Sequence, residues 1–147
     1  MVSRQLKGLE HSKAQRLPFG VFCAVIRLPE EGTTLFLKKI TTTYGGKNYL
    51  FVNGGMTDNI RPALYNAVYE CDIVNKMNAK KDILVDVVGK CCESGDIIRH
   101  NVLVPNINDG DIMVVYATGA YNYSMSSNYN NLLKPAVVLL GEKPIII

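Results

Sequence analysis

Apolar and polar residues alternate in short runs from Thr33 onward, and such alternation is typical of β-strands. The run 33–40 is rich in β-branched residues, and a second run, 49–53, follows the turn-forming stretch 43–48. Two such runs on either side of a turn predict a β-hairpin. Residues 111–119 (DIMVVYATG) give the clearest strand pattern in the chain. Further strand-like runs lie at 70–76, 82–90 and 134–147, the last with a turn inside it.

The segments between these runs carry most of the polar side chains. Residues 54–69 open with two glycines and predict a loop with one or two helical turns. Residues 105–111 predict a turn, and residues 120–131 predict a long loop of polar and aromatic residues. Several short strands at nearly regular spacing indicate a mainly β fold, a sandwich or a barrel, with functional groups on its loops.

The first 31 residues differ from the rest of the chain. They are polar and basic, and no hydrophobic period is sustained along them, which suits a frayed helix or a linker. The composition changes near Gly32. We therefore predict a poorly assignable N-terminal segment, 1–31, followed by a β-domain, 32–147.

Composition narrows the class of protein. The chain has 147 residues, of which 48% are hydrophobic and 20% charged, so we expect one globular domain with its own core. The net charge of +3 comes from scattered lysines and arginines without a basic run, which argues against nucleic acid as a partner. No apolar run approaches the roughly 18 to 20 residues that a membrane span needs, and no signal peptide is recognisable.

Cysteine usage indicates the compartment. The chain has four cysteines, and Cys91 and Cys92 are neighbours in a protein that is not otherwise rich in cysteine. This pattern favours reduced thiols and a cytoplasmic protein over a disulfide framework. The spacing of cysteines and histidines does not fit a zinc site.

Three loops concentrate groups that could carry chemistry. The first, GGMTDNIRPALY (54–65), contains Arg61, which can hold a carboxylate or phosphate through two parallel hydrogen bonds. Tyr65 lies four residues later, so one helical turn would place both side chains on one face. The alternative is a solvated arginine and a half-buried tyrosine without a functional role.

The second loop, CCESGD (91–96), places a thiol beside the carboxylate of Glu93 and ends in a turn. Such a thiol could donate a proton or act as a nucleophile if its surroundings adjust its pKa. The alternative is that the cysteines are small core residues, and we expect this for at least one of the pair because strand alternation would point only one outward.

The third loop, TGAYNYSMSSNYN (118–130), carries Tyr121, Tyr123 and Tyr129 among serines and asparagines. Its hydroxyls could bind a phosphate, and its rings could stack on a planar ligand. The alternative is a polar surface loop. No single one of these three signals decides between function and structure.

Taken in this order, the three stretches closely resemble the C-terminal part of diaminopimelate decarboxylases. The resemblance rests on GGMTDNIRPALY (54–65), CESGD (92–96) and GAYNYSMSSNYN (119–130), and it runs from about residue 32 to about residue 140. The related ornithine and arginine decarboxylases differ around the cysteine, so CESGD favours diaminopimelate as the substrate.

The resemblance implies a fold and an activity. Members of the family are alanine racemase-like (fold type III) enzymes that use pyridoxal 5'-phosphate, with a TIM-type barrel that holds the cofactor and a C-terminal β-barrel or sandwich domain. They are cytoplasmic homodimers of lysine biosynthesis, with active sites at the subunit interface. They convert meso-2,6-diaminopimelate to L-lysine and carbon dioxide.

The resemblance also implies roles for five residues. Cys92 matches the proton donor, which reaches in from the partner subunit, and Glu93 matches the group that binds the distal amino group of the substrate. Arg61 and Tyr65 match groups that hold the distal carboxylate. Tyr121 matches a residue that touches both cofactor and substrate, and Cys91 is left as a packing residue.

The chain departs from the family pattern in what it lacks. A TIM barrel takes roughly 250 residues, and only 31 precede the resemblance, so we expect neither the barrel nor its cofactor lysine in this chain. Three interpretations remain open: the β-domain of a truncated or split decarboxylase, a non-catalytic β-domain that binds or regulates a full-length decarboxylase, or a degenerate remnant. Alone, the chain is expected to be inactive.

Overall fold

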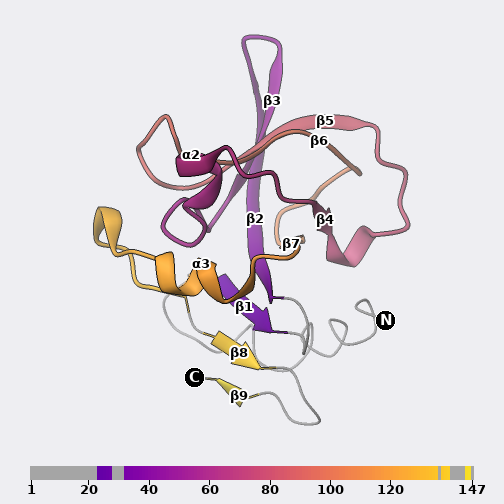
Figure 1. Ribbon diagram of the computed structural model, residues 1–147. Helices are drawn as coiled ribbons and strands as arrows, with labels where there is room; N and C mark the ends of the chain where they lie inside the picture. Colours follow the sequence, from indigo (N-terminus) through magenta and orange to yellow (C-terminus); the bar gives the residue numbers. More distant parts are fainter. Residues whose placement is uncertain (1–22, 28–31, 136, 140–144, 147) are drawn as a thin grey trace.

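The computed structural model describes residues 23–27, 32–135, 137–139 and 145–146, and the described part is built mainly of strands (Figure 1). The strands are β1 (Cys23–Arg27), β2 (Gly32–Tyr44), β3 (Lys47–Val52), β4 (Cys71–Ile73), β5 (Ile83–Val88), β6 (Ile97–Val104), β7 (Ile112–Val115), β8 (Val137–Leu139) and β9 (Ile145–Ile146). The helical turns are α2 (Arg61–Tyr65), η1 (Val74–Lys76), α3 (Gly119–Met125) and η2 (Tyr129–Asn131).

The long strand β2 organises the sheet. Its first half pairs antiparallel with β1 and β7, and its second half pairs antiparallel with β3. A register shift between Lys38 and Ile40 marks the point where the pairing changes, and such bulges bend a strand. The hydrogen-bonded order is β6-β5-β3-β2-β1-β8-β9, with β7 joining β2 to β4. Within the described residues no pairing joins β6 to β9, so the sheet is not closed into a barrel.

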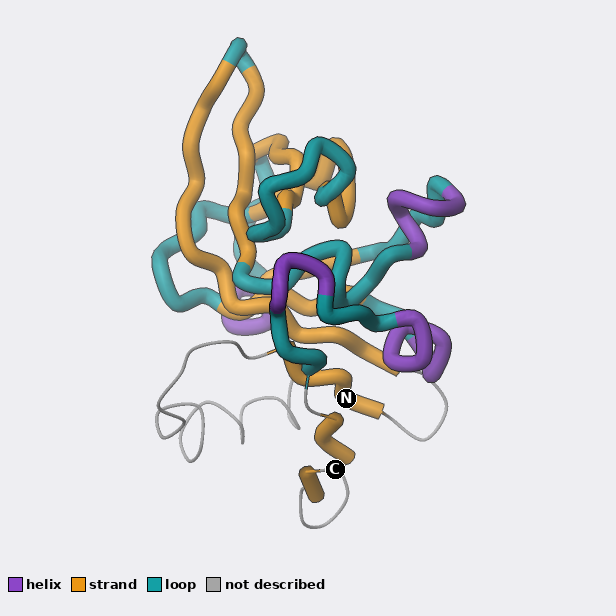
Figure 2. Tube along the Cα trace, turned by 90° about the vertical axis from the view of Figure 1, so that its left-hand side faces the viewer, coloured by secondary structure: helices purple, strands orange, loops and turns teal. Residues whose placement is uncertain are grey.

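The β2–β3 hairpin extends well beyond the rest of the molecule (Figure 2). Its two-residue turn consists of Gly45 and Gly46, whose φ angles are 57° and 80°. Two successive positive φ angles suit glycine and match the twist of the flanking strands. The register places Tyr44 opposite Lys47, as the glycine pair between two strand-like runs predicts.

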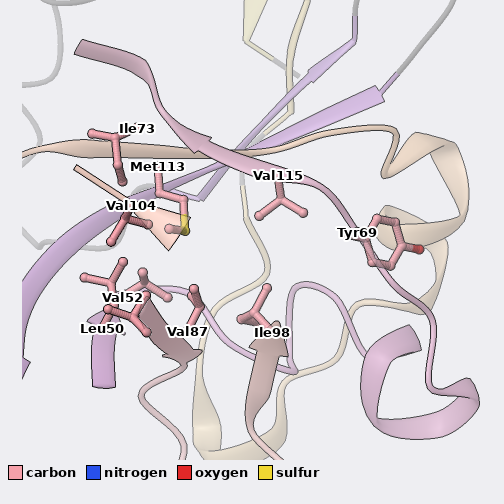
Figure 3. Close-up of a cluster of buried hydrophobic side chains, with 10 residues drawn as sticks. Leu50, Val52, Tyr69, Ile73, Val87, Ile98, Val104, Met113 and Val115 are labelled. Atoms are coloured by element: carbon pink, nitrogen blue, oxygen red, sulfur yellow. The ribbon is translucent and has the colours of Figure 1, made fainter. Parts of the chain in front are cut away.

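The core lies between the sheet β3-β5-β6 and the pair β4-β7. Figure 3 shows Leu50, Val52, Val87 and Ile98 on one side of the cluster, opposite Ile73, Met113 and Val115. These side chains are at most 3% exposed. Burying apolar side chains of this size contributes about 1.5 to 3 kcal/mol each, so this cluster is the main source of stability for the described domain.

The mainly β fold expected from the sequence is confirmed, and three details differ. Strand β6 was not predicted, because the polar residues Arg99 to Asn101 interrupt its apolar pattern. Strand β1 lies in the segment that we expected to be a frayed helix or a linker, and it pairs with β2 and β8. The expected loop at 120–131 was wrong in its first half, because residues Gly119–Met125 form α3.

Candidate functional site

The three loops singled out in the sequence meet at one place in the structure. We call them the glycine-pair loop (54–60), the cysteine loop (89–96) and the tyrosine segment (119–131). The Lys90 N–H donates to the Gly54 carbonyl at 3.2 Å, and the Ser127 N–H donates to the Thr57 carbonyl at 3.0 Å. The Tyr129 hydroxyl donates to Glu93 Oε2 at 3.4 Å. Each loop therefore contacts the other two.

The carboxylate of Asp96 joins the cysteine loop to the glycine-pair loop. Its Oδ1 accepts the Met56 N–H at 2.6 Å, and its Oδ2 accepts the Cys91 N–H at 2.7 Å. The side chain is only 3% exposed. A Cβ built on Gly55 would lie 2.8 Å from Asp96 Oδ2, and one built on Gly89 would overlap the same carboxylate. Glycine at these two positions is what lets the buried acid fit.

The two neighbouring cysteines face different environments. Cys91 is buried, and Cys92 is exposed. Burial and the adjacent Asp96 carboxylate raise the pKa of the Cys91 thiol to about 11, which keeps it protonated and unreactive. The expectation that one of the pair is a core residue is confirmed, although this stretch is a bend and not a strand.

Glu93 lies on the same turn as Cys92 and is exposed. The turn is closed by the Asp96 N–H, which donates to the Glu93 carbonyl at 3.1 Å. The side chain accepts from the Ser94 hydroxyl at 3.3 Å and the Gly95 N–H at 3.4 Å, besides Tyr129. The negative charge of Glu93 raises the pKa of Tyr129 above its ordinary value. The exposed thiol of Cys92 and the exposed carboxylate of Glu93 thus belong to adjacent residues of one surface turn.

Arg61 lies within cation–π distance of two aromatic rings. Its guanidinium carbon is 5.4 Å from the Tyr65 ring centroid and 5.9 Å from the Tyr121 ring centroid. Arg61 begins α2, where Pro62 suits the first helical turn, and this turn places Tyr65 on the same face as expected. Tyr65 is 60% exposed and Tyr121 72% exposed. The stacked guanidinium still offers N–H groups to an anion from solvent.

Polar side chains are buried beneath this exposed surface, and sequence reasoning missed them. Thr57, Asn59 and Asn122 are at most 2% exposed, and their side-chain polar atoms have no partner among the described residues. Between Thr57 and Asn59, burial raises the pKa of Asp58 to about 6, although the Gly55 N–H donates to its Oδ2 at 2.9 Å. Three consecutive polar residues after a glycine pair were the available signal.

The described residues offer a phosphate-bearing cofactor a side contact but no site for its phosphate group. Four N–H groups of the glycine-pair loop are already used: those of Gly55 and Met56 bond to carboxylates, and those of Asp58 and Asn59 bond to the Gly55 carbonyl. This loop is therefore not a phosphate nest. The exposed ring of Tyr121 is the group that could lie against a planar cofactor.

Two other kinds of feature, a metal site and a membrane span, are not seen among the described residues. No group of three or more histidine, cysteine or acidic side chains there is placed to hold a metal ion. Within the same part of the chain, no helix is long and apolar enough to cross a membrane.

A family model described as the C-terminal sheet domain of pyridoxal-dependent decarboxylases matches residues 28–119. The chain belongs to this family. It is 46% identical over 121 residues to a diaminopimelate decarboxylase of Bacillus methanolicus, covering 80% of this chain and 28% of the relative. It is also 46% identical over 150 residues to a diaminopimelate decarboxylase of a Synechocystis species, covering 94% of this chain and 31% of the relative.

A solved structure supports the same assignment. The diaminopimelate decarboxylase of M. jannaschii in complex with L-lysine superimposes with a TM-score of 0.73 at 25% identity, covering 78% of this chain and 26% of that one. The chain thus spans less than a third of the length of these relatives. The resemblance to the C-terminal part of diaminopimelate decarboxylases is confirmed. The roles of Arg61, Tyr65, Cys92, Glu93 and Tyr121, and a domain boundary near residue 32, stay predictions.

Proposed function

We propose that this chain is the sheet-domain part of a diaminopimelate decarboxylase, which converts meso-2,6-diaminopimelate to L-lysine and carbon dioxide. The observation that carries the proposal is the convergence of the three loops. The exposed Cys92, Glu93 and Tyr121 lie on these loops, and the partly buried Arg61 lies beside Tyr121. The names of the relatives supply the substrate, and the bound L-lysine of one solved relative is the corresponding product.

Cys92 is the proposed proton donor. Loss of carbon dioxide leaves a substrate carbon that must receive one proton, and a positioned thiol can deliver it near neutral pH. Of the two neighbouring thiols only that of Cys92 is exposed, while burial keeps the Cys91 thiol away from any substrate. Cys92 is therefore the proposed proton donor, and Cys91 is a buried packing residue.

Glu93 and Arg61 are the proposed readers of the substrate. Diaminopimelate carries an amino group and a carboxylate at the end that does not react, so recognition of that end needs an anion and a cation. Glu93 supplies the anion next to the proton donor. Arg61, whose planar guanidinium lies near the rings of Tyr65 and Tyr121, supplies two parallel N–H donors for the carboxylate.

The pyridoxal cofactor of the family supplies the electron sink that makes loss of carbon dioxide feasible. Within this chain Tyr121 is the residue proposed to contact it, while the groups that hold its aldehyde and phosphate come from elsewhere. Because the proposed functional side chains lie at the surface of this domain, we infer that a second protein surface completes the active site. We propose a barrel-bearing chain or a second subunit in that role, as the resemblance implies.

The test is to co-express the full chain with the complementary portion of the Bacillus methanolicus relative, the region that this chain does not match, and to measure lysine formation. Cys92→Ala should lower kcat and kcat/KM together by about 10²- to 10⁴-fold, as expected for a proton donor. Cys91→Ala is the matched control and should change both by less than about threefold, because it removes a buried group with no part in the reaction.

Two results would count against this assignment. If Cys91→Ala were the severe variant and Cys92→Ala the mild one, the roles within the pair would be reversed. If the complex of the unsubstituted chain, with both cysteines present, assembled but formed no lysine, the chain would be a non-catalytic β-domain.

Arg61→Ala should raise KM more than it lowers kcat, which separates recognition from proton delivery.

A further inference from the structure

We propose that Asp96 is the positioning residue of the site: its buried carboxylate fixes the cysteine loop, and with it Cys92 and Glu93, against the glycine-pair loop that leads to Arg61. The functional half of this inference rests on the proposed function. Asp96 itself does not reach the exposed surface, because its side chain is only 3% exposed.

The contacts of Asp96 reach both loops through the backbone. One carboxylate oxygen accepts from Met56 in the glycine-pair loop, and the other accepts from Cys91 in the cysteine loop. Both bonds are short, at 2.6 and 2.7 Å, and a charged acceptor makes such bonds roughly twice as strong as neutral ones. The Asp96 carbonyl also accepts the Gly89 N–H at 2.9 Å, which closes the base of the loop.

The geometry requires a carboxylate and not another polar group of the same size. Both partners of the side chain are N–H donors, so each oxygen has to accept. An asparagine would accept one N–H and present its own NH₂ group to the other, leaving two donors face to face. The buried donor that loses its acceptor then carries a desolvation penalty, and the loop opens more often.

Cysteine labelling reports this positioning without any enzyme activity. In the full chain carrying Cys92→Ser, the cysteine loop retains one thiol, that of the buried Cys91, and Cys71 on β4 serves as an internal reference. Alkylation by iodoacetamide, resolved peptide by peptide by mass spectrometry, gives a rate for each thiol. Adding Asp96→Asn should accelerate labelling of Cys91 about tenfold or more while leaving Cys71 unchanged. Because losing the carboxylate also lowers the pKa of the Cys91 thiol, the Gly55→Ala variant described below, which keeps the charge, has to accelerate labelling of Cys91 as well.

Asp109→Asn is the matched control, since Asp109 is an exposed acid in a surface turn, and it should change neither rate. Unchanged labelling of Cys91 in Asp96→Asn would overturn the proposal. So would equal acceleration at Cys91 and Cys71, because that result describes unfolding of the whole domain and not release of one loop.

A second variant keeps the proposal testable if Asp96→Asn does not fold. Gly55→Ala retains the carboxylate but places a methyl group 2.8 Å from it. It should also accelerate labelling of Cys91 alone, by a smaller factor. Gly95→Ala is its control, because a Cβ there would meet nothing closer than 4.0 Å, and it should leave labelling unchanged. Equal labelling in the two glycine variants would contradict the role assigned to Asp96.

The functional consequence is read in the co-expressed complex. Asp96→Asn should lower kcat about tenfold or more and also raise KM, since the displaced loop carries both the proton donor Cys92 and the substrate-reading Glu93. Asp109→Asn should leave both constants unchanged. If Asp96→Asn releases Cys91 in the labelling experiment yet retains full kcat, a functional role for this positioning is overturned. A complex without activity even with Asp96 present would instead count against the proposed function alone.

Discussion

The apolar core between the strands and the loop cluster, by which we mean the three converging loops at 54–60, 89–96 and 119–131, both contain well-buried residues. They are held together by different forces. The core contains Leu50, Val87 and Met113, all fully buried and apolar. The loop cluster buries Asp58 and Asp96 at 3% exposure, together with Asn59 and Asn122 at 1%. An apolar core tolerates exchanges of similar volume, whereas a buried polar group depends on particular partners. The fold can therefore persist while the site is disturbed by a change of a single atom.

The largest effect on stability should come from the core. Met113 is completely buried on β7, opposite Ile73 of β4. Met113→Ala should lower the free energy of unfolding by about 2 to 5 kcal/mol, since it leaves a cavity as well as losing buried apolar area. Urea-induced unfolding followed by circular dichroism measures the change.

The matched control for the core is Leu103→Ala, in which the side chain is 55% exposed on β6. Its truncation should cost about 1 kcal/mol or less, because little cavity is formed. If both variants lost the same stability, the cluster drawn in Figure 3 would not be the stabilising core of this domain.

The second-largest effect on stability should come from the loop cluster, whose stability, unlike that of the apolar core, depends on pH. Burial raises the pKa of Asp58 from 3.8 to about 6, so the folded state favours its protonated form. The contribution of this carboxyl to stability is complete below about pH 4 and is lost as the pH rises through 6. The loss amounts to about 2 to 3 kcal/mol for a shift of this size.

Asp58→Asn removes this titration, so the stability of the unsubstituted protein relative to the variant should fall between pH 4 and pH 7. Urea unfolding of both proteins at pH 4.5, 5.5 and 7 gives that difference. The pKa values of Asp86 and Asp111 are lowered, so their contributions to stability are lost as the pH falls below about 4. Both acids are present in both proteins, so they do not affect the difference. Parallel curves for the two proteins would mean that Asp58 is not buried as described.

A smaller effect tests the contact between α2 and α3 that completes the loop cluster. A cation–π pair near the surface contributes about 0.5 to 1 kcal/mol, and Arg61 lies 5.9 Å from the Tyr121 ring. A double-mutant cycle with Arg61→Gln and Tyr121→Leu should return a coupling energy of about this size. The same cycle with Tyr123 in place of Tyr121 is the control and should return a value near zero. Equal couplings would remove the reason for placing Arg61 beside Tyr121.

The contrast between the two regions also explains what the sequence could predict. The hairpin was predictable because Gly45 and Gly46 separate two apolar runs, and local turn chemistry determines the rest. Helix α3 was not predictable from hydrophobic period, because its buried residue Asn122 and the buried cap residues on either side, Thr118 and Ser126, are polar, while Tyr121 is exposed.

The candidate site also contains residues that the sequence could predict and residues that it could not. Arg61, Cys92 and Glu93 were predicted as site residues because their motifs occur in the order typical of a known family, and their roles stay predictions. The buried acids Asp58 and Asp96 were missed as functional candidates, since aspartate is rarely buried and nothing local signals that two backbone N–H groups from separate loops will surround one carboxylate. Contacts between residues 40 positions apart, such as Met56 with Asp96, arise only when the sheet has brought both loops to one end.

The smallest expected effect concerns the exposed contact between the cysteine loop and the tyrosine segment. Tyr129 donates its hydroxyl to Glu93, and the charge of Glu93 is the largest of the causes that raise the pKa of that phenol. Removing the charge with Glu93→Gln should therefore lower the pKa of Tyr129 toward its ordinary value, since ionisation no longer places two negative charges together. Tyrosine labelled with ¹³C at Cζ, assigned through Tyr129→Phe, allows this single phenol to be titrated by NMR.

An unchanged titration of Tyr129 in Glu93→Gln would show that the two loops do not meet at the surface in solution. The loop cluster would then be joined through its buried backbone contacts, those of Asp96 and Thr57, and Glu93 would be free to turn entirely toward a substrate. A lowered pKa of Tyr129 would instead mean that a substrate amino group has to compete with this phenol for the Glu93 carboxylate.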